Sequence, residues 1–252
     1  MNIWIVTTGS SDVQLKTDDY WNDWYDHSTV KRACENLPFK PTQLIEDSDE
    51  PYRIVPRVLG MVYEAQSEEV WECLEFPLLR QFTAQLKGKI IDKIILLLTE
   101  QTNTFDEDQR EDRRCPYWQD TCELQPILER YFKEQEYFRD VELIPILLSP
   151  KKNKPGLDDW NYVLTIVQTA FSEEIKLEPD TVYVSHQAGT PAISSAVQFV
   201  SLAKFNERVK FLVSNEYEKK PLDPIDSSEY LRGIRLQEAK ALLNRYDYSG
   251  AK

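Results

Sequence analysis

Five short runs of aliphatic and β-branched residues are the feature that most constrains the fold of this chain. Each run is hydrophobic at nearly every position, which is typical of strands that are covered on both faces of a parallel sheet. Segments with helical spacing lie between them, and this alternation predicts an α/β fold with helices on both faces. The predicted strands are Ile3–Thr7, Lys93–Leu98, Val141–Leu147, Thr181–Ser185 and Val209–Val213.

The predicted helices have recognisable starts and ends. One begins with Pro77 and stops at Gly88, in the order expected for a helix. Asp120 and Glu123 resemble a capping box, and Pro126 is expected to delay or kink the helix that follows. Further helices are predicted at 158–175 and 191–203, and loops at 16–26 and 102–116.

Composition limits the classes of function that are open to the chain. Its 252 residues can bury a sizeable core, and no run of apolar residues is long enough for a membrane helix. The N-terminus lacks the features of a signal peptide, so we expect a cytoplasmic protein. The net charge of −13 argues against binding to DNA or long RNA, which needs basic residues against phosphates. Any nucleotide ligand is therefore expected to be small and held in a local pocket.

Cysteines and histidines are too few and too scattered for a metal site. The four cysteines form no C-x-x-C pair, and two histidines cannot complete a zinc-finger pattern. We therefore expect no metal and no cofactor, and we interpret the cysteines as buried or incidental thiols in a reducing compartment. These cysteines are Cys34, Cys73, Cys115 and Cys122.

Two turns of small and hydroxyl-bearing residues follow the first and the fourth predicted strands. The turn TTGSSD contains Gly9 and the turn SHQAGTP contains Gly189, two of only seven glycines in the chain. Both would lie at the carboxyl ends of their strands, where open parallel sheets bind ligands. Such turns let the backbone approach a phosphate, while N–H groups of the next helix face the anion. Either turn alone is equally consistent with an ordinary strand–helix connection, but together they predict a ligand site.

Familiar nucleotide and hydrolase motifs are missing. The chain has no G-x-G-x-x-G after its first strand and no G-x-x-x-x-G-K-[ST] anywhere, so dinucleotide-binding and P-loop interpretations are weak. The absence of G-x-S-x-G argues against a serine of the α/β-hydrolase type.

The two turns, together with the segment DKIILLLTEQTNTF, resemble those of the CARF domain, the CRISPR-associated Rossmann-fold sensor of type III CRISPR ancillary proteins. The segments QDTCELQPILERYF and LLNRYDYSGA are similar to that family as well, so the resemblance spans about Ile3 to Ala251. It implies a Rossmann-like, mostly parallel CARF domain over 1–225 and a C-terminal helical linker over 226–252, leading towards an effector domain. One departure is Ala188, where many relatives have glycine, and a lysine found in some relatives is absent.

This resemblance implies a homodimer that binds a cyclic oligoadenylate, most often cyclic tetraadenylate, across a two-fold interface in antiviral defence. His186 would stack on or bond an adenine, or else cap its own turn. The implied ligand-binding residues are Thr8, Gly9, Ser10, Ser11 and Asp12 in the first turn, Gln187, Ala188, Gly189, Thr190 and Pro191 in the second, and Gln101 and Thr102 nearby.

Several functions stay open on the sequence. The chain is a sensor, or a ring nuclease that opens its ligand without a metal, with Ser10, Ser11 and Thr190 orienting the reacting groups and His186 accepting a proton. Neither His27 nor His186 has an arginine at the spacing of a HEPN ribonuclease, so this activity is not expected in the chain itself. The chain is alternatively the sensor half of a longer CARF–HEPN ribonuclease. A Rossmann-like protein-interaction module without a nucleotide is the remaining alternative.

Overall fold

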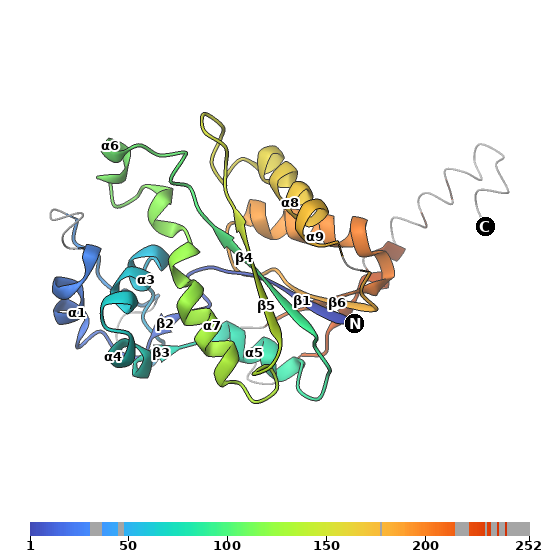
Figure 1. The fold of residues 1–252 in the computed structure, drawn as a ribbon, viewed down its shortest axis with the longest axis horizontal. Helices are drawn as coiled ribbons and strands as arrows, with labels where there is room; N and C mark the ends of the chain where they lie inside the picture. The colour runs from blue at the N-terminus through green and yellow to red at the C-terminus, as the bar shows by residue number, and fades with distance from the viewer. Residues whose placement is uncertain are drawn as a thin grey trace.

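A six-stranded sheet forms the centre of the computed structural model (Figure 1), with the strand order β5-β4-β1-β6-β7-β8. Neighbouring strands in the series β5-β4-β1-β6-β7 are parallel, and the short β8 is antiparallel to β7. The strands are β1 Asn2–Thr7, β4 Lys93–Thr99, β5 Glu142–Leu148, β6 Thr181–Ser185, β7 Val209–Leu212 and β8 Ile225–Asp226. The structure describes residues 1–30, 37–44, 48–176, 178–214, 222–229, 231–232, 236 and 240.

The order of the strands creates a switch point beside β1. The chain runs outward from β1 through β4 to β5, and then returns to the other side of β1 to form β6 and β7. The connections that leave β1 and β6 therefore diverge to opposite sides of the sheet. Ligand sites of open α/β sheets lie in the crevice that such a divergence leaves at the carboxyl ends of the strands.

Helices cover both faces of the sheet (Figure 1). Successive side chains of β1 point to opposite faces, so Trp4 and Val6 belong to one buried cluster and Ile3 and Ile5 to the other. The first cluster includes residues of α3 Pro56–Ala65, α5 Pro77–Gln85 and α7 Gln125–Glu134, and the second those of α8 Trp160–Glu174 and α9 Pro191–Phe205. The predicted α/β class, with a mostly parallel sheet between helices, is confirmed.

Shorter elements complete the fold. They are α1 Trp21–His27, α4 Ser67–Glu72, α6 Glu107–Arg110, β2 Gln14–Leu15, β3 Leu74–Glu75 and the 3-10 turns η1 Pro116–Gln119, η2 Cys122–Leu124 and η3 Asn206–Arg208.

The five predicted strands are confirmed to within one residue at each end, and the helices at 77–87, 158–175 and 191–203 to within two. Three local predictions are wrong. The segment 16–26 is not all loop, because α1 begins at Trp21, and the segment 102–116 contains α6. Asp120 caps no helix: α7 follows η2 without a side-chain cap, because the Asp120 carboxylate is buried against Arg57 and Gln101.

Within the described ranges, no helix is long and apolar enough to cross a membrane. Cys73, Cys115 and Cys122 are free thiols, as expected, and Cys34 lies outside the described residues. Most of the helical linker predicted over 226–252 also lies outside them, including the apolar positions Ala239, Leu242 and Leu243.

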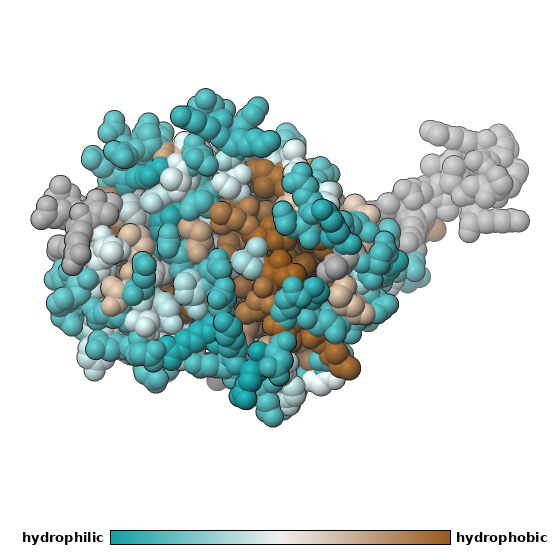
Figure 2. Space-filling model, in the orientation of Figure 1, coloured by the Kyte–Doolittle hydropathy of each residue, from teal (hydrophilic) through white to brown (hydrophobic). Residues whose placement is uncertain are grey.

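An apolar surface lies over the region of β5 (Figure 2). Among the described strands β5 forms one edge of the sheet, and its Leu147 side chain is 51% exposed. Pro145 is exposed as well, and it has no backbone N–H to donate to a further strand. Proline in an edge strand is a common protection against pairing with another chain.

Candidate functional site

The turns that follow β1 and β6 lie against each other at the carboxyl edge of the sheet. Their strands are neighbours, with Val6 paired to Ser185. Gly9 is buried, and a Cβ atom at this position would lie 2.6 Å from the backbone nitrogen of Gly189. Gly189 has a φ of +90°, a conformation that favours glycine, and a Cβ atom there would lie 3.4 Å from the carbonyl oxygen of Thr8. The two turns therefore meet backbone to backbone at the switch point, and both glycines are needed for this contact.

Buried polar groups fix the shape of the first turn. The Thr8 hydroxyl lies 2.8 Å from the Leu97 carbonyl oxygen and 2.7 Å from Thr121 Oγ1. Asp12 is fully buried, and its Oδ2 accepts a hydrogen bond of 2.7 Å from the Gly9 N–H. Its Oδ1 has no partner among the described residues. Burial raises the pKa of Asp12 to about 8, against the effect of the Gly9 hydrogen bond, so the carboxyl is mostly neutral at pH 7.

Ser10 and Ser11 are the more accessible members of this turn. Both are half-buried, and neither hydroxyl makes a hydrogen bond to a described residue. Each serine lines a different cavity beside the turn. Their hydroxyls can therefore bond a ligand without first breaking an internal contact.

The second turn leads directly into α9. Thr190 is the N-cap: its Oγ1 accepts a hydrogen bond of 3.3 Å from the Ile193 N–H and donates one of 3.1 Å to the Leu157 carbonyl. Pro191 occupies the first turn of the helix, as expected. The exposed Gln187 donates from Nε2 to the Ser214 carbonyl at 3.1 Å. Ala188 is buried, with its Cβ 3.5 Å from the position of a Cβ atom on Gly9, so its methyl group fits the contact between the turns.

His186 is held inside the protein. Its Nδ1 lies 3.0 Å from Ser194 Oγ, in the first turns of α9, and its ring packs edge-on against Phe211 at 5.3 Å. Its Nε2 is buried without a partner among the described residues. Burial lowers the pKa of His186, so the imidazole is neutral at pH 7. These contacts agree better with a histidine that caps its turn than with one that stacks on an adenine.

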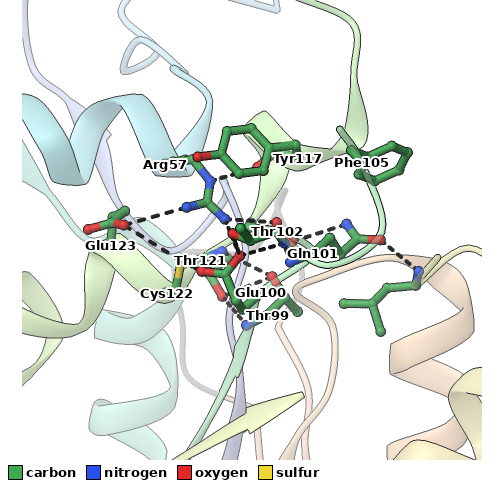
Figure 3. Close-up of polar contacts among 12 residues, drawn as sticks. Arg57, Thr99, Glu100, Gln101, Thr102, Phe105, Tyr117, Thr121, Cys122 and Glu123 are labelled. Atoms are coloured by element: carbon green, nitrogen blue, oxygen red, sulfur yellow. Dashed lines mark hydrogen bonds and ion pairs between the residues drawn. The ribbon is translucent and has the colours of Figure 1, made fainter. Parts of the chain in front are cut away.

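A buried arginine that the sequence analysis missed organises the turn after β4 (Figure 3). Arg57 is 3% exposed, and its Nη2 lies 2.9 Å from Glu100 Oε1 and 2.9 Å from Asp120 Oδ2. Its Nε donates to the Tyr117 carbonyl at 2.8 Å, and its guanidinium lies 3.8 Å from the centre of the Tyr117 ring. A charged residue within the apolar sequence IVPRVLG was the one available signal of this network.

The two carboxylates beside Arg57 have opposite pKa shifts, because their burial differs. Asp120 is almost fully buried, and this burial raises its pKa in spite of the arginine. Glu100 is 21% exposed, so a smaller effect of burial is outweighed by hydrogen bonds from Thr102 and Cys122 and by the charge of Arg57. The pKa of Glu100 is lowered to about 2.

Gln101 connects this network to the second turn. Its Nε2 donates to Asp120 Oδ1 at 3.0 Å, and its Oε1 accepts from the Leu157 N–H at 2.8 Å. The Leu157 carbonyl in turn accepts from Thr190. Gln101 is therefore a buried residue whose amide nitrogen and oxygen both have internal partners. Thr102 is exposed and donates its N–H to Glu100 at 2.8 Å.

Two cavities flank the first turn, and one arginine lines both. The larger, of about 520 Å³, is lined by Ser10 together with Lys40 and Arg53. The smaller, of about 330 Å³, is lined by Ser11 and Gln187, and again by Arg53. Both volumes lie in the range of small-molecule sites. Nothing in the local sequence around Arg53 or Lys40 indicates this position, because only the fold brings them to Ser10.

A cavity of about 690 Å³ lies at the amino-terminal ends of the strands, between the ends of α8 and α9. The loops around it enter strands instead of leaving them, and Arg208 beside it pairs with Glu178 at 3.0 Å. Because ligands of open parallel sheets bind at the carboxyl ends, we place the candidate site at the two turns. Within the described part of the chain, no group of three or more His, Cys, Asp or Glu side chains is arranged to hold a metal ion.

Comparison with known proteins finds similarity among solved structures only. No protein-family model matches the chain, and no curated protein matches it. Among solved structures, the fold is similar to that of Enterococcus italicus Csm6 bound to cyclic hexa-2'-fluoro-hexa-dAMP, with a TM-score of 0.46 and 12% sequence identity. The match covers 100% of this chain and 47% of that one, so the chain spans about half the length of Csm6. A likeness this distant does not identify a function.

Proposed function

We propose that this chain is a sensor domain that binds a cyclic oligoadenylate, with cyclic tetraadenylate as the first candidate, in the way of the CARF domains that its motifs resemble. The contact between Gly9 and Gly189 carries the proposal. It joins the two turns with CARF-like sequences at the switch point, where a ligand is expected. Gly189 is exposed and has no side chain, so its backbone is open to a phosphate, whereas the buried Gly9 allows the close contact that holds the second turn in place.

The net charge of −13 is compatible with this ligand. A small cyclic anion needs only local donors, and hydrogen bonds from backbone amides and hydroxyls to phosphate oxygens are among the stronger ones in proteins. Ser10 and Ser11 offer hydroxyls, and the start of α9 offers N–H groups at its positive end.

A homodimer is part of the proposal. A cyclic tetraadenylate ring has two-fold symmetry, so two copies of the chain facing each other across the turns would each hold half of it. The exposed positions of Gln187, Gly189 and Pro191 are consistent with a second turn that is open to such a ligand.

Opening of the ring is a second candidate, favoured by one observation. The hydroxyls of Ser10 and Ser11 make no internal bond to described residues, so they can orient a ribose 2′-hydroxyl and a phosphate oxygen. Thr190 and His186 are less suited to this role, because the first caps α9 and the second has a buried Nε2. Any cleavage would then rest on positioning and hydrogen bonding, without a metal.

Calorimetric titration with cyclic tri-, tetra- and hexaadenylate, followed by analysis of the products, tests the proposal. Wild type should bind one of the rings, and Gly189→Val should lose most of this affinity. Gly88→Val is the matched control, because Gly88 also has a positive φ, of +78°, but has open space around it at the far edge of the sheet. Equal affinity in wild type and Gly189→Val would contradict the site, and a strict monomer in light scattering with bound ligand would contradict the shared ring.

A further inference from the structure

Among the described residues that line the cavity beside Ser10, four are basic and none is acidic. Its basic residues are Lys40, Arg53, Arg113 and Arg114. The whole chain has 43 acidic residues against 30 basic ones, so four cations around one space of about 520 Å³ run against the composition. Clefts lined by one sign of charge concentrate ions of the opposite sign.

Two of these four cations have no acidic neighbour among the described residues. Arg114 is paired with Asp112 at 2.9 Å, and the charge of Arg113 also acts on that carboxylate. Lys40 and Arg53 have no ion pair with any described residue. Within the described residues, two cations of the cavity therefore have no acid that competes with an anionic ligand.

The position of Arg53 is set by its backbone. Its N–H donates to the Thr42 carbonyl at 2.7 Å, and the Thr42 N–H donates to its carbonyl at 2.8 Å. This isolated bridge keeps Arg53 beside Thr42, two residues after Lys40. Arg53 lines the cavities of both Ser10 and Ser11, so it stands beside the first turn from two sides. A guanidinium presents a fork of N–H donors that matches the oxygens of a phosphate group.

We propose that this cavity is a phosphate-binding site, in which Arg53 and Lys40 contact phosphate groups of the same ligand that the two turns hold, and this rests on the proposed function. The turns supply backbone amides at the switch point, and the cavity supplies the positive charge next to them. Ser10 lies on the boundary between the two parts and donates its hydroxyl to the same phosphate. The chain can thus bind a small polyanion in spite of its acidic surface, because the compensating charge is local.

The test compares Arg53→Gln and Lys40→Gln with Arg139→Gln. Arg139 is exposed, pairs with no described acid and lies before β5, at the amino-terminal ends of the strands. Its replacement by glutamine changes the net charge by the same amount and leaves the cavity unchanged. Calorimetry with cyclic tetraadenylate should show a loss of about tenfold or more for each cavity variant, the size expected for one charge-assisted hydrogen bond. It should also show a weaker dependence on salt in these variants. The control should bind within about twofold of wild type, because remote exposed charges are screened.

Inorganic tripolyphosphate is the second probe, because it has the charge of the ligand without its bases. If wild type binds cyclic tetraadenylate and both cavity variants bind it equally well, the cavity inference is wrong and the proposed function stands. If wild type binds no cyclic oligoadenylate but binds tripolyphosphate through Arg53, the phosphate site stands and the proposed function fails. Binding of neither probe overturns both. Arg53→Lys, which keeps the charge and loses the fork, should have intermediate affinity and serves if Arg53→Gln does not fold.

Discussion

Replacement of Gly9 by alanine tests the contact on which the candidate site depends. The added Cβ atom would lie 2.6 Å from the Gly189 backbone nitrogen, a distance at which a backbone segment has to move. The φ of Gly9 is outside the left-handed region, so alanine brings a steric clash without backbone strain. Overpacking of this kind costs about 1–3 kcal/mol. In a domain of this size each kcal/mol lowers the unfolding temperature by about 2–4 °C, so we expect a decrease of roughly 2–12 °C.

Thermal unfolding and calorimetric titration with cyclic tetraadenylate would measure the two effects separately. Gly9→Ala should lose affinity by much more than its lower stability explains, because the two turns are pushed apart. Gly88→Ala is the control: its φ of +78° strains an alanine, but no atom lies within 4 Å of the new Cβ. This variant should be destabilised by about 1–2 kcal/mol and should bind normally. Wild-type stability and affinity in Gly9→Ala would refute the close contact.

Three further predictions concern charge and catalysis. The pKa of Asp12 is about 8 in the folded protein and 3.8 in the unfolded chain, so between these pH values the folded protein binds more protons than the unfolded chain. Wild type should therefore lose stability relative to Asp12→Asn as the pH rises from about 4 to about 8, by up to about 1.4 kcal/mol per pH unit, and urea unfolding curves of the two should converge near pH 4. Arg57→Met should lower the free energy of unfolding, measured in urea, by about 3–5 kcal/mol, because it leaves the buried Asp120 without its cation. Arg114→Met breaks an exposed pair and should lower it by less than about 1 kcal/mol. Equal losses would contradict the buried network. If wild type opens cyclic tetraadenylate, Ser11→Ala should slow the reaction about 100-fold and EDTA should not affect it; inhibition by EDTA would show that the mechanism is wrong.

The sheet could be predicted from the sequence because its evidence is local. Runs such as KIILLL and TVYVS are hydrophobic at most positions, and this pattern over so few β-branched and aliphatic residues is typical of strands covered on both faces. Short helices such as α3 and α4 were missed, although Pro56 stands at the start of α3. The capping box at Asp120 failed for a physical reason: pairing with a buried arginine from a distant helix outweighs a hydrogen bond to a nearby N–H.

The candidate site was only partly predictable. The position of both turns at one edge follows from the strand directions, and the structure agrees. Their direct contact, the burial of Asp12 and the arrival of Arg53 beside Ser10 depend on residues far apart in the chain, for which no local pattern exists. Gln101 shows the same limit, because its amide is occupied by Asp120 and Leu157 from other segments.

The pairing of β1 with β6 also has a consequence for folding. β1 is a central strand, and it pairs with β6, which follows it in the chain only after β4, β5 and the helices α3, α5, α7 and α8 have been synthesised. Contacts between such distant segments require the closure of a long loop, which makes them slow to form. Gly9 and Gly189 therefore come together only when β6 has paired with β1. We expect partly folded chains to have no ligand site at all, so that ligand binding would report on the completely folded domain.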